Sequence, residues 1–395
     1  MARRGAGAAA VRAAAPGRAA AETTASDNGA TTAEERAFVA SQGQLVWRKF
    51  RRHKLAVMAI VVLGALYFIS LFAEFFTPYP VLHRFKEFGE APPTRVRFVS
   101  PTRGLSRPFV FARARELDKA TFTYQYTDSD RELVIRFFVR SEEPFTLLGF
   151  IPWNVKLFGI EDPSVPLFLF GSDRLGRDVF SRTFYAGRVS LFIGFGGVFV
   201  AFILGVILGG MSGYYGGVVD DAIQRVIDML LSIPTIPLWI ALSAALPHDW
   251  GILKIYFAIT IILALLAWPG LARVVRGKLI SLREEDFVMA AQVAAAKNGA
   301  IIRRHLVPGF TSYLITHLTL AIPFMIAGET ALSFLGLGIR APAVSWGTLL
   351  QDAQSISVLA LQPWLIIPAF PVILAVMMFN FVGDGLRDAA DPYAT

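Results

Sequence analysis

Six hydrophobic runs, separated by polar residues, set the pattern of the chain. A helix needs about 20 consecutive apolar residues to cross roughly 30 Å of hydrocarbon. The runs therefore predict an all-α integral membrane protein with six transmembrane helices, and this even number of spans places both termini on one side. Pro234 and Pro237 interrupt the third span. The predicted spans are residues 55–76, 189–212, 229–247, 252–270, 312–336 and 359–382.

Basic residues beside the short connections orient these spans, because Lys and Arg close to a span stay on the cytoplasmic side. Residues 47–54 (WRKFRRHK) precede the first span, and the loop at 272–310, between the fourth and fifth spans, is also rich in Lys and Arg. Two separate observations thus predict a cytoplasmic N-terminus, a cytoplasmic loop and a cytoplasmic C-terminus at 385–395. The stretch 77–187 is then external, and its arginines are compatible with this because long loops escape the rule.

The regions outside the spans differ in composition. Residues 1–44 are rich in Ala, Gly, Thr and Arg, with no aromatic residue before Phe38, which predicts a disordered cytoplasmic tail. Residues 45–80 form an amphipathic segment and the first span. The external stretch divides into an insertion at 81–169 and an interfacial segment at 170–188. Apolar and polar residues alternate in parts of the insertion, as in RELVIRFFVR and ATFTYQY, so we expect a small β-rich unit there.

Composition supports the membrane assignment and excludes several functions. The 395 residues are 54% hydrophobic and 17% charged, with a mean hydropathy of +0.52, whereas soluble domains average about 25% charged residues. The chain has no cysteine, which excludes disulfides, thiolate catalysis and cysteine metal sites. Residues 1–54 hold ten Lys and Arg against four acidic residues, so most of the net charge of +8 lies beside the first span. Such a placement favours membrane orientation over nucleic-acid binding.

The motifs of self-contained chemistry are missing from the sequence. No G-x-x-x-x-G-K-[ST] loop occurs, since Gly277-Lys278 is followed by Leu279, so we expect no nucleotide to bind this chain. The five histidines show no metal-ligand spacing, and no cluster of catalytic side chains marks an enzyme. Aspartates beside the spans are expected to act as helix caps or in interfacial ion pairs. These aspartates are Asp173, Asp178, Asp220, Asp221 and Asp228.

Glu329 is the exception, because it lies inside the fifth span in IAGETALSFLGLG. An ionisable group within a span is energetically costly and usually faces a bundle interior or water. Glu329 is therefore a candidate pathway or gating residue. The alternative is a polar anchor bonded to a neighbouring helix, or a position near the external end of the span.

A second unusual stretch, DFVMAAQVAAAKNGAIIRRHLVPG, lies in the cytoplasmic loop. Asp286 can begin a helix, and residues 287–297 include five alanines, which predicts a helix with a low-relief face. Asn298-Gly299 is expected to end it, with a short second helix over 301–307 before Pro308. A small-residue helix can dock in a groove of a partner. The alternative is a connector whose basic residues hold lipid headgroups.

This stretch is similar to the EAA loop of binding-protein-dependent ABC importer permeases, in which the pattern E-A-A-x3-G-x9-I-x-L-P binds a separate ATPase. Ala290 and Ala291 match the alanines, and residues 306–308 resemble the closing segment. Met289 replaces the glutamate and Ala295 the glycine, and Gly299, four residues later, is the candidate position for a relocated turn.

Further segments resemble the C-type subunit of oligopeptide and dipeptide permeases, and together they cover most of residues 45–80 and 170–395. They include FGSDRLGRDVFSRTFYAGRVSL, GYYGGVVDDAIQRVIDMLLSIP, ETALSFLGLG, PAVSWGTLL and GDGLRDAADP. The resemblance implies a five-helix permease core at 189–384, preceded by one extra helix. Residues 81–165 match no segment of the family that we can name.

The resemblance also implies the partners. Two cytoplasmic ATPases would bind the loop and carry ATP and Mg²⁺, so this chain would hold no cofactor and no metal. A sister permease would complete the pore, and an external solute-binding protein would deliver the solute. The residues assigned to ATPase coupling are Asp286, Phe287, Ala290, Ala291, Ala294, Ala295, Gly299, Arg304, His305 and Pro308.

The function that follows is the transmembrane subunit of an ATP-driven importer in a bacterial inner membrane, working by alternating access. Its expected solutes are oligopeptides or dipeptides. Oligosaccharides or metal chelates are the alternative solutes, and an ion-coupled secondary transporter, with Glu329 as its coupling site, is the alternative mechanism.

Overall fold

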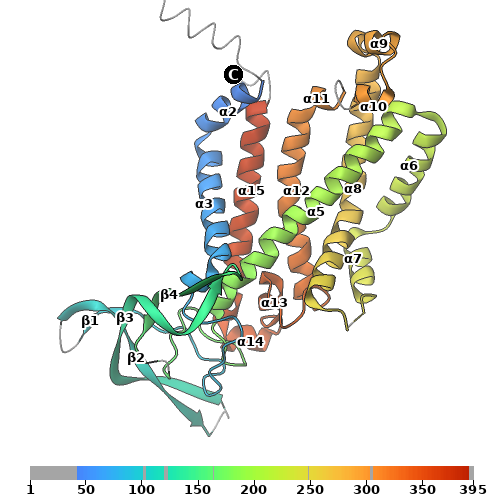
Figure 1. Ribbon diagram of the computed structural model, residues 1–395. Coiled ribbons are helices and arrows are strands. Elements are labelled where there is room, and N and C mark those ends of the chain that lie inside the picture. Colours follow the sequence, from blue (N-terminus) through green and yellow to red (C-terminus); the bar gives the residue numbers. More distant parts are fainter. Residues whose placement is uncertain are drawn as a thin grey trace, which may run out of the picture.

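The structure is a computed structural model that describes residues 42–100, 104–119, 123–162, 164–247, 249–302 and 306–390. Nearly all of the predicted tail at 1–44 thus lies outside the described residues. Helices dominate the fold, and a small antiparallel sheet lies between the first and second long helices (Figure 1). Five helices are long and apolar enough to cross a membrane, and a sixth span is formed if one bent pair is counted. The predicted fold class is confirmed.

The chain begins with two helices that meet at His53. Helix α2 (Gln42–Arg52) ends in a basic turn, and α3 (Lys54–Leu71) is the first long apolar helix. The two are separated because the His53 backbone is extended, and its Nδ1 accepts a hydrogen bond of 3.1 Å from the Ala56 amide as an N-cap. A short helix, α4 (Ala73–Phe76), follows α3.

The predicted β-rich insertion is a four-stranded antiparallel sheet, β1-β2-β3-β4. Its strands are β1 (Arg97–Ser100), β2 (Gly104–Asp118), β3 (Thr123–Leu147) and β4 (Ile151–Ile160). Pairs such as Phe109↔Val134 and Phe137↔Phe158 set the register. Alternation places a small apolar set on one side of the sheet, where Val110 and Ile135 are buried.

The longest helices, α5 (Val179–Tyr215) and α8 (Ile252–Arg283), form the most extensive helix contact. Glycines allow this approach. A Cβ atom at Gly209 would lie 2.4 Å from the Ala272 carbonyl oxygen, and one at Gly213 would lie 2.7 Å from the Arg276 carbonyl oxygen. Small residues at such spacing let two helix backbones touch. Helix α5 begins ten residues before the predicted span at 189.

The third predicted span, 229–247, corresponds to two helices divided at the predicted interruption. They are α6 (Gly217–Ser232) and α7 (Thr235–Ala244), bent by 88° at the break between them, and α6 begins twelve residues before the predicted span. Pro234 explains the break, because it lacks an amide hydrogen and forces Ile233 before it into an extended conformation. Pro237 is tolerated, since it lies in the first turn of α7.

The C-terminal half completes the bundle. Helix α12 (Thr311–Phe334) and α15 (Ala369–Ala390) pack against each other, and α15 also packs against α3. Short helices α13 (Trp346–Gln351), α14 (Ile356–Leu361) and η2 (Pro363–Ile366) connect them. Three further short helices, α9 (Asp286–Val293), α10 (Asn298–Ile301) and α11 (Val307–Gly309), link α8 to α12.

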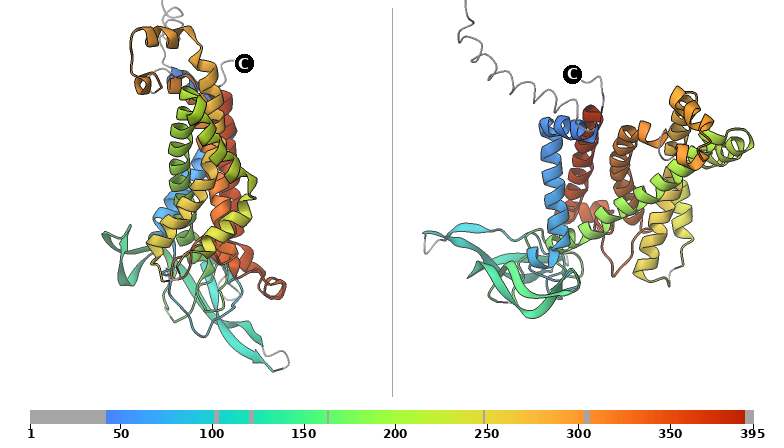
Figure 2. Two further views of the ribbon diagram at one scale, coloured as in Figure 1. Left: turned by 90° about the vertical axis from the view of Figure 1, so that its right-hand side faces the viewer. Right: turned by 45° about the horizontal axis from the view of Figure 1, so that its top comes forward.

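The bundle has two distinct ends, which we name the α9 end and the sheet end. Helix α2, the C-terminal end of α15 and helices α9 to α11 lie at the α9 end, and the β-sheet with α13 and α14 lies at the opposite one (Figures 1 and 2). The arrangement agrees with an even number of membrane crossings between α2 and the end of α15.

Candidate functional site

The segment α9–α11 extends beyond the bundle. Helix α8 continues to Arg283, and α9 lies at its far end as the outermost element on that side (Figures 1 and 2). Of the residues expected to couple to an ATPase, Arg304 and His305 lie outside the described residues. Pro308 lies in α11.

The first helix of this segment ends earlier than predicted. Asn298-Gly299 does not end α9 but begins α10, and α9 stops at Val293. The cause is Ala295, whose φ of 54° is left-handed. The Ala296 amide then reaches back to the Ala291 carbonyl oxygen at 3.1 Å, which is the 6→1 bond of a Schellman cap. The turn is therefore not relocated to Gly299: Ala295 adopts the conformation that a glycine normally takes there.

The inner face of the segment is tied to α5 and α8 by a small apolar cluster. Val288, Ile301 and Leu306 are fully buried against Leu279 of α8. The Tyr214 hydroxyl of α5 donates a hydrogen bond of 2.9 Å to the Asn298 side-chain oxygen. Val288 in α9, together with Ile301 and Leu306 after it, thus attaches the segment to the ends of α5 and α8.

The outer face of α9 is apolar and open. Val293 is 89% exposed, and Phe287 and Met289 are also exposed large hydrophobic residues. The two matched alanines separate, since Ala290 is exposed whereas Ala291 packs against the inner cluster. The structure brings the predicted residues together in one segment but divides them between two faces. Those exposed are Asp286, Phe287, Ala290, Ala294, Ala295 and Gly299.

Two residues of the outer face, Met289 and Val293, did not figure among the predicted coupling residues. They follow Asp286 at i+3 and i+7, which is the spacing of one helix face. The 3.6-residue period of the predicted helix could therefore have placed Met289 and Val293 on the same face as Asp286. Exposed apolar residues on a projecting helix favour contact with another protein over contact with water.

Glu329 is completely buried in α12. The Ser190 hydroxyl of α5 donates to its Oε2 at 3.0 Å, and the Ser333 hydroxyl donates to its Oε1 at 2.7 Å. Ser190 in turn accepts from the Trp346 amide at 3.0 Å. Glu329 therefore joins α12 to α5 and to the start of α13, as the anchor alternative predicts. A gating role stays a prediction.

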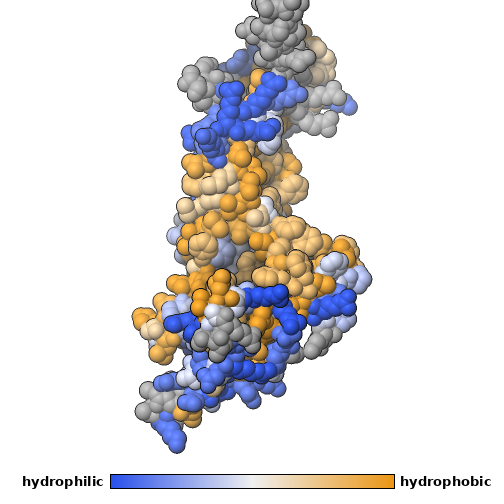
Figure 3. All heavy atoms as spheres, turned by 90° about the vertical axis from the view of Figure 1, so that its left-hand side faces the viewer, coloured by the Kyte–Doolittle hydropathy of each residue, from blue (hydrophilic) through white to orange (hydrophobic). Residues whose placement is uncertain are grey.

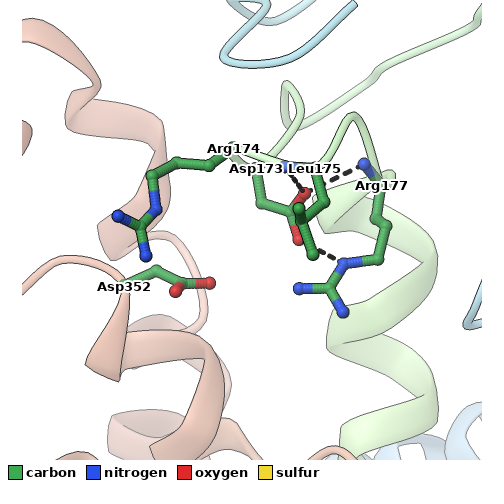
Figure 4. Close-up of a pocket in the computed structure, with 5 residues that line it drawn as sticks. All are labelled: Asp173, Arg174, Leu175, Arg177 and Asp352. Atoms are coloured by element: carbon green, nitrogen blue, oxygen red, sulfur yellow. Dashed lines mark hydrogen bonds and ion pairs between the residues drawn. The ribbon is translucent and has the colours of Figure 1, made fainter. Parts of the chain in front are cut away.

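A polar network holds the sheet end of α5. Asp173 accepts hydrogen bonds from the Leu175 and Arg177 amides at 2.9 and 3.0 Å, and pairs with the side chains of Arg177 and Arg182. A pocket of about 290 Å³ lies beside it, lined by Arg174 from the loop before α5 and by Asp352 at the end of α13 (Figure 4). Burial raises the pKa of the Asp352 carboxyl.

The aspartates predicted to cap helices or form ion pairs largely do so. Asp178 is the N-cap of α5 and accepts from the Ser181 amide at 2.8 Å, and burial raises its pKa to about 7. Asp220 pairs with Arg276, and Asp228 pairs with Arg273. Within the described ranges, no group of three or more His, Asp or Glu could hold a metal ion.

The fold and this segment define a class, a multi-pass membrane permease domain. Residues 201–394 match the family model of the binding-protein-dependent transport system inner membrane component, and residues 41–93 match the N-terminal transmembrane domain of oligopeptide transport permease C. The chain belongs to this family of inner-membrane transport permeases, as the next relatives also show, and it is a transport component rather than an enzyme.

The relatives are peptide permease proteins. The dipeptide transport system permease protein DppC of Bacillus subtilis is 40% identical over 224 residues, which cover 56% of this chain and 68% of the relative. The oligopeptide transport system permease protein OppC of the same organism is 39% identical, covering 60% and 76%. OppC of Haemophilus influenzae is 41% identical, covering 56% and 70%. A solved structure, the inward-facing methionine ABC transporter MetNI, covers 52% of this chain and 94% of that chain at 18% identity and a TM-score of 0.40.

Proposed function

We propose that this chain is the translocation subunit of an ATP-driven importer for oligopeptides or dipeptides. The peptide assignment follows from its similarity to permease proteins of dipeptide and oligopeptide transport systems. The observation that carries the mechanism is the outer face of α9, an apolar surface on a projecting helix at the end of α8. A chain without a nucleotide-binding loop needs such a surface to receive work from a separate ATPase.

The α9 end is the cytoplasmic end in this proposal. Basic residues support it, because Lys49, Arg51 and Arg52 end α2, and Arg283 ends α8 at the same side. Both termini are then cytoplasmic and the sheet end is external. Two ATPases bind ATP and Mg²⁺ and contact α9, a sister permease completes the pore, and a binding protein delivers the solute at the sheet end.

The conformational change passes through α8. ATP-driven closure of the two ATPases displaces α9, which is attached to α8 and α5 by Val288 and its buried neighbours. Glycine contacts prevent α8 from sliding past α5, so the two helices move as one body. Alternating access results if ATP binding favours one of the two orientations of this body.

Val293→Glu tests the docking surface. We expect it to remove most of the ATPase that co-purifies with the permease, and to abolish uptake, because it places a charge at the most exposed hydrophobic residue of the apolar face. Val99→Glu is the matched control, since Val99 is also an exposed valine (64%) but lies in β1 at the sheet end. Normal ATPase content and uptake in Val293→Glu would overturn the docking assignment.

Glu329→Gln separates the importer from an ion-coupled transporter. We expect it to reduce uptake less than Val293→Glu and to leave the ATPase bound, because the glutamine amide oxygen still accepts from one serine hydroxyl and its NH2 group can donate to the other. Abolished uptake in an intact complex would assign a gating role to Glu329. The solute itself is tested by identifying what the associated binding protein retains, with peptides expected and oligosaccharides or metal chelates as the contrary results.

A further inference from the structure

The four-stranded sheet lies outside both family matches, which cover residues 41–93 and 201–394. It is nevertheless fastened to the ends of two membrane helices. The Lys156 ammonium of β4 donates to the Pro78 carbonyl oxygen, just after α4, at 2.5 Å. The ring of Phe158 in β4 lies 5.8 Å from that of Phe180 in the first turn of α5. The sheet is thus held where these helices leave the membrane.

A continuous series of aromatic rings connects the surface of α3 to the sheet. Phe68 is exposed on α3, and its ring centroid lies 5.8 Å from that of Phe76 in α4. Phe76 lies 5.2 Å from Phe75, and Phe75 lies 6.5 Å from Phe138 in β3. The surface that faces hydrocarbon on α3 therefore continues onto the strand without a polar gap.

Beyond Phe138 the sheet exposes further aromatic side chains. Phe138 and Phe150 are 66% and 73% exposed, and Phe137 and Trp153 are also exposed. We name Phe138, Phe150 and Trp153 the aromatic patch, because Phe137 pairs with Phe158 and therefore lies on the opposite face of the strand pair from Trp153. Phe138 has a φ of 57°, a left-handed conformation that is strained for a non-glycine residue. Strained residues of this kind concentrate where their placement serves a purpose.

Figure 3 views the side of the molecule that carries α3 and the sheet. A hydrophobic band covers the helices, hydrophilic residues bound it at both ends, and hydrophobic residues continue from the band onto the part of the sheet region nearest to it. Trp and Tyr are enriched at this level of a membrane because their rings are amphipathic, and Phe is typical of the apolar face of elements that lie in the interface.

The geometry points to a phospholipid surface as the ligand of the aromatic patch: the patch lies in the interfacial layer at the sheet end and holds the insertion flat against the bilayer. A basic residue agrees with this partner. Arg140 is exposed two positions after Phe138, so its guanidinium can reach phosphate groups. Lipid is favoured over a docked protein because the patch is continuous with the membrane face of α3.

The cysteine-free sequence allows a direct experiment. The full chain, purified with the subunits that accompany it, would carry one cysteine labelled with the fluorophore NBD and be reconstituted in phosphatidylcholine vesicles. Phe138→Cys probes the patch, and Phe150→Cys is a second site if the first disturbs β3. Glu116→Cys is the control, since it is exposed near the end of β2 that lies farthest from the helices (Figure 1).

We expect lipid carrying a doxyl group near the headgroup to quench both patch probes several-fold more than the Glu116→Cys probe, and aqueous iodide to show the reverse order. Equal iodide quenching at all three sites would place the patch in water and overturn the inference. Protection from both quenchers would show that another protein covers the patch, which would also overturn it.

Discussion

Helix α8 takes part in two contacts of opposite character. Along α5 it lies so close that glycines replace side chains, and a Cβ atom at Gly205, Gly209 or Gly213 would overlap Leu271, Ala272 or Arg276. At its far end α8 is followed by α9. There Val288 packs into the apolar cluster and is fully buried, whereas the outer face of α9 is exposed to solvent.

The difference shows how a displacement can travel through the molecule. Helices α5 and α8 are packed without free volume, so they cannot slide along each other. Helix α9 has an exposed apolar face, which a partner protein can bind. Because α8 belongs to both regions, a force on α9 is expected to move α5 as well. The sheet end of α5 is fixed in a third way, by buried ion pairs around Asp173.

The largest expected effect comes from breaking these ion pairs. Asp173→Asn leaves the buried Arg182 guanidinium without its carboxylate. Removing one partner of a buried pair costs about 3–5 kcal/mol, so we expect the free energy of unfolding in detergent to fall by that amount. Asp228→Asn is the control, because its pair with Arg273 is exposed and such pairs contribute about 0–1 kcal/mol. Similar losses in both variants would show that the network does not anchor α5.

The glycine contact gives the next effect. Gly209→Ala would place a Cβ atom 2.4 Å from the Ala272 carbonyl oxygen, so α5 and α8 must separate. Overpacking of this kind costs about 1–3 kcal/mol, measurable as a lower thermal unfolding midpoint. The neighbouring Gly210 meets only Leu279 Cδ1 at 3.8 Å, so Gly210→Ala should not destabilise the protein and should add about 0.5–1 kcal/mol from helix preference. An equal loss of stability in Gly209→Ala and Gly210→Ala would show that the close approach of α5 and α8 at Gly209 is not what makes this position intolerant of a side chain.

Sequence reasoning succeeded where a local rule decides the structure. Hydrophobic runs located the membrane helices, alternation located the sheet, and aspartates beside the spans proved to be caps or ion-pair partners, as Asp178 and Asp220 show. For Glu329 it offered a polar anchor to a neighbouring helix as the alternative to a gating role, and it could not name Ser190, since a contact over 139 residues leaves no trace in one sequence.

It failed where two rules competed. The interruption at Pro234 was predicted, but the hydrophobic run indicated neither the 88° bend there nor the start of α6 at Gly217. In the candidate segment, Asn298-Gly299 offered a helix stop by composition, and tertiary packing overrode it, because the buried Ile301 and the Tyr214 hydrogen bond draw residues 298–301 into a new helix. Whether Ala290 or Ala291 faces outward likewise depends on tertiary structure, because the position and direction of the end of α8 determine how α9 is oriented.

The smallest expected effect concerns Ala295, and it has the opposite sign. In Ala295→Gly the left-handed φ of 54° no longer strains a Cβ atom, which favours the folded cap by about 1–2 kcal/mol. Glycine also widens the unfolded ensemble, which removes about 0.5–1 kcal/mol of this gain. The net stabilisation should be about 1 kcal/mol and confined to α9, so hydrogen exchange of the Ala296 amide should slow severalfold while global unfolding hardly changes.

Ala294→Gly is the control for this last substitution, because Ala294 is exposed in the same turn but has no positive φ. In Ala294→Gly no strain is relieved, and the larger conformational entropy of glycine in the unfolded state destabilises the end of α9. Hydrogen exchange of the amides there should therefore become faster by a few-fold. Opposite changes at two adjacent alanines would show that the turn itself is strained. Changes of the same sign would mean that the inner apolar cluster, and not the cap, determines where α9 ends.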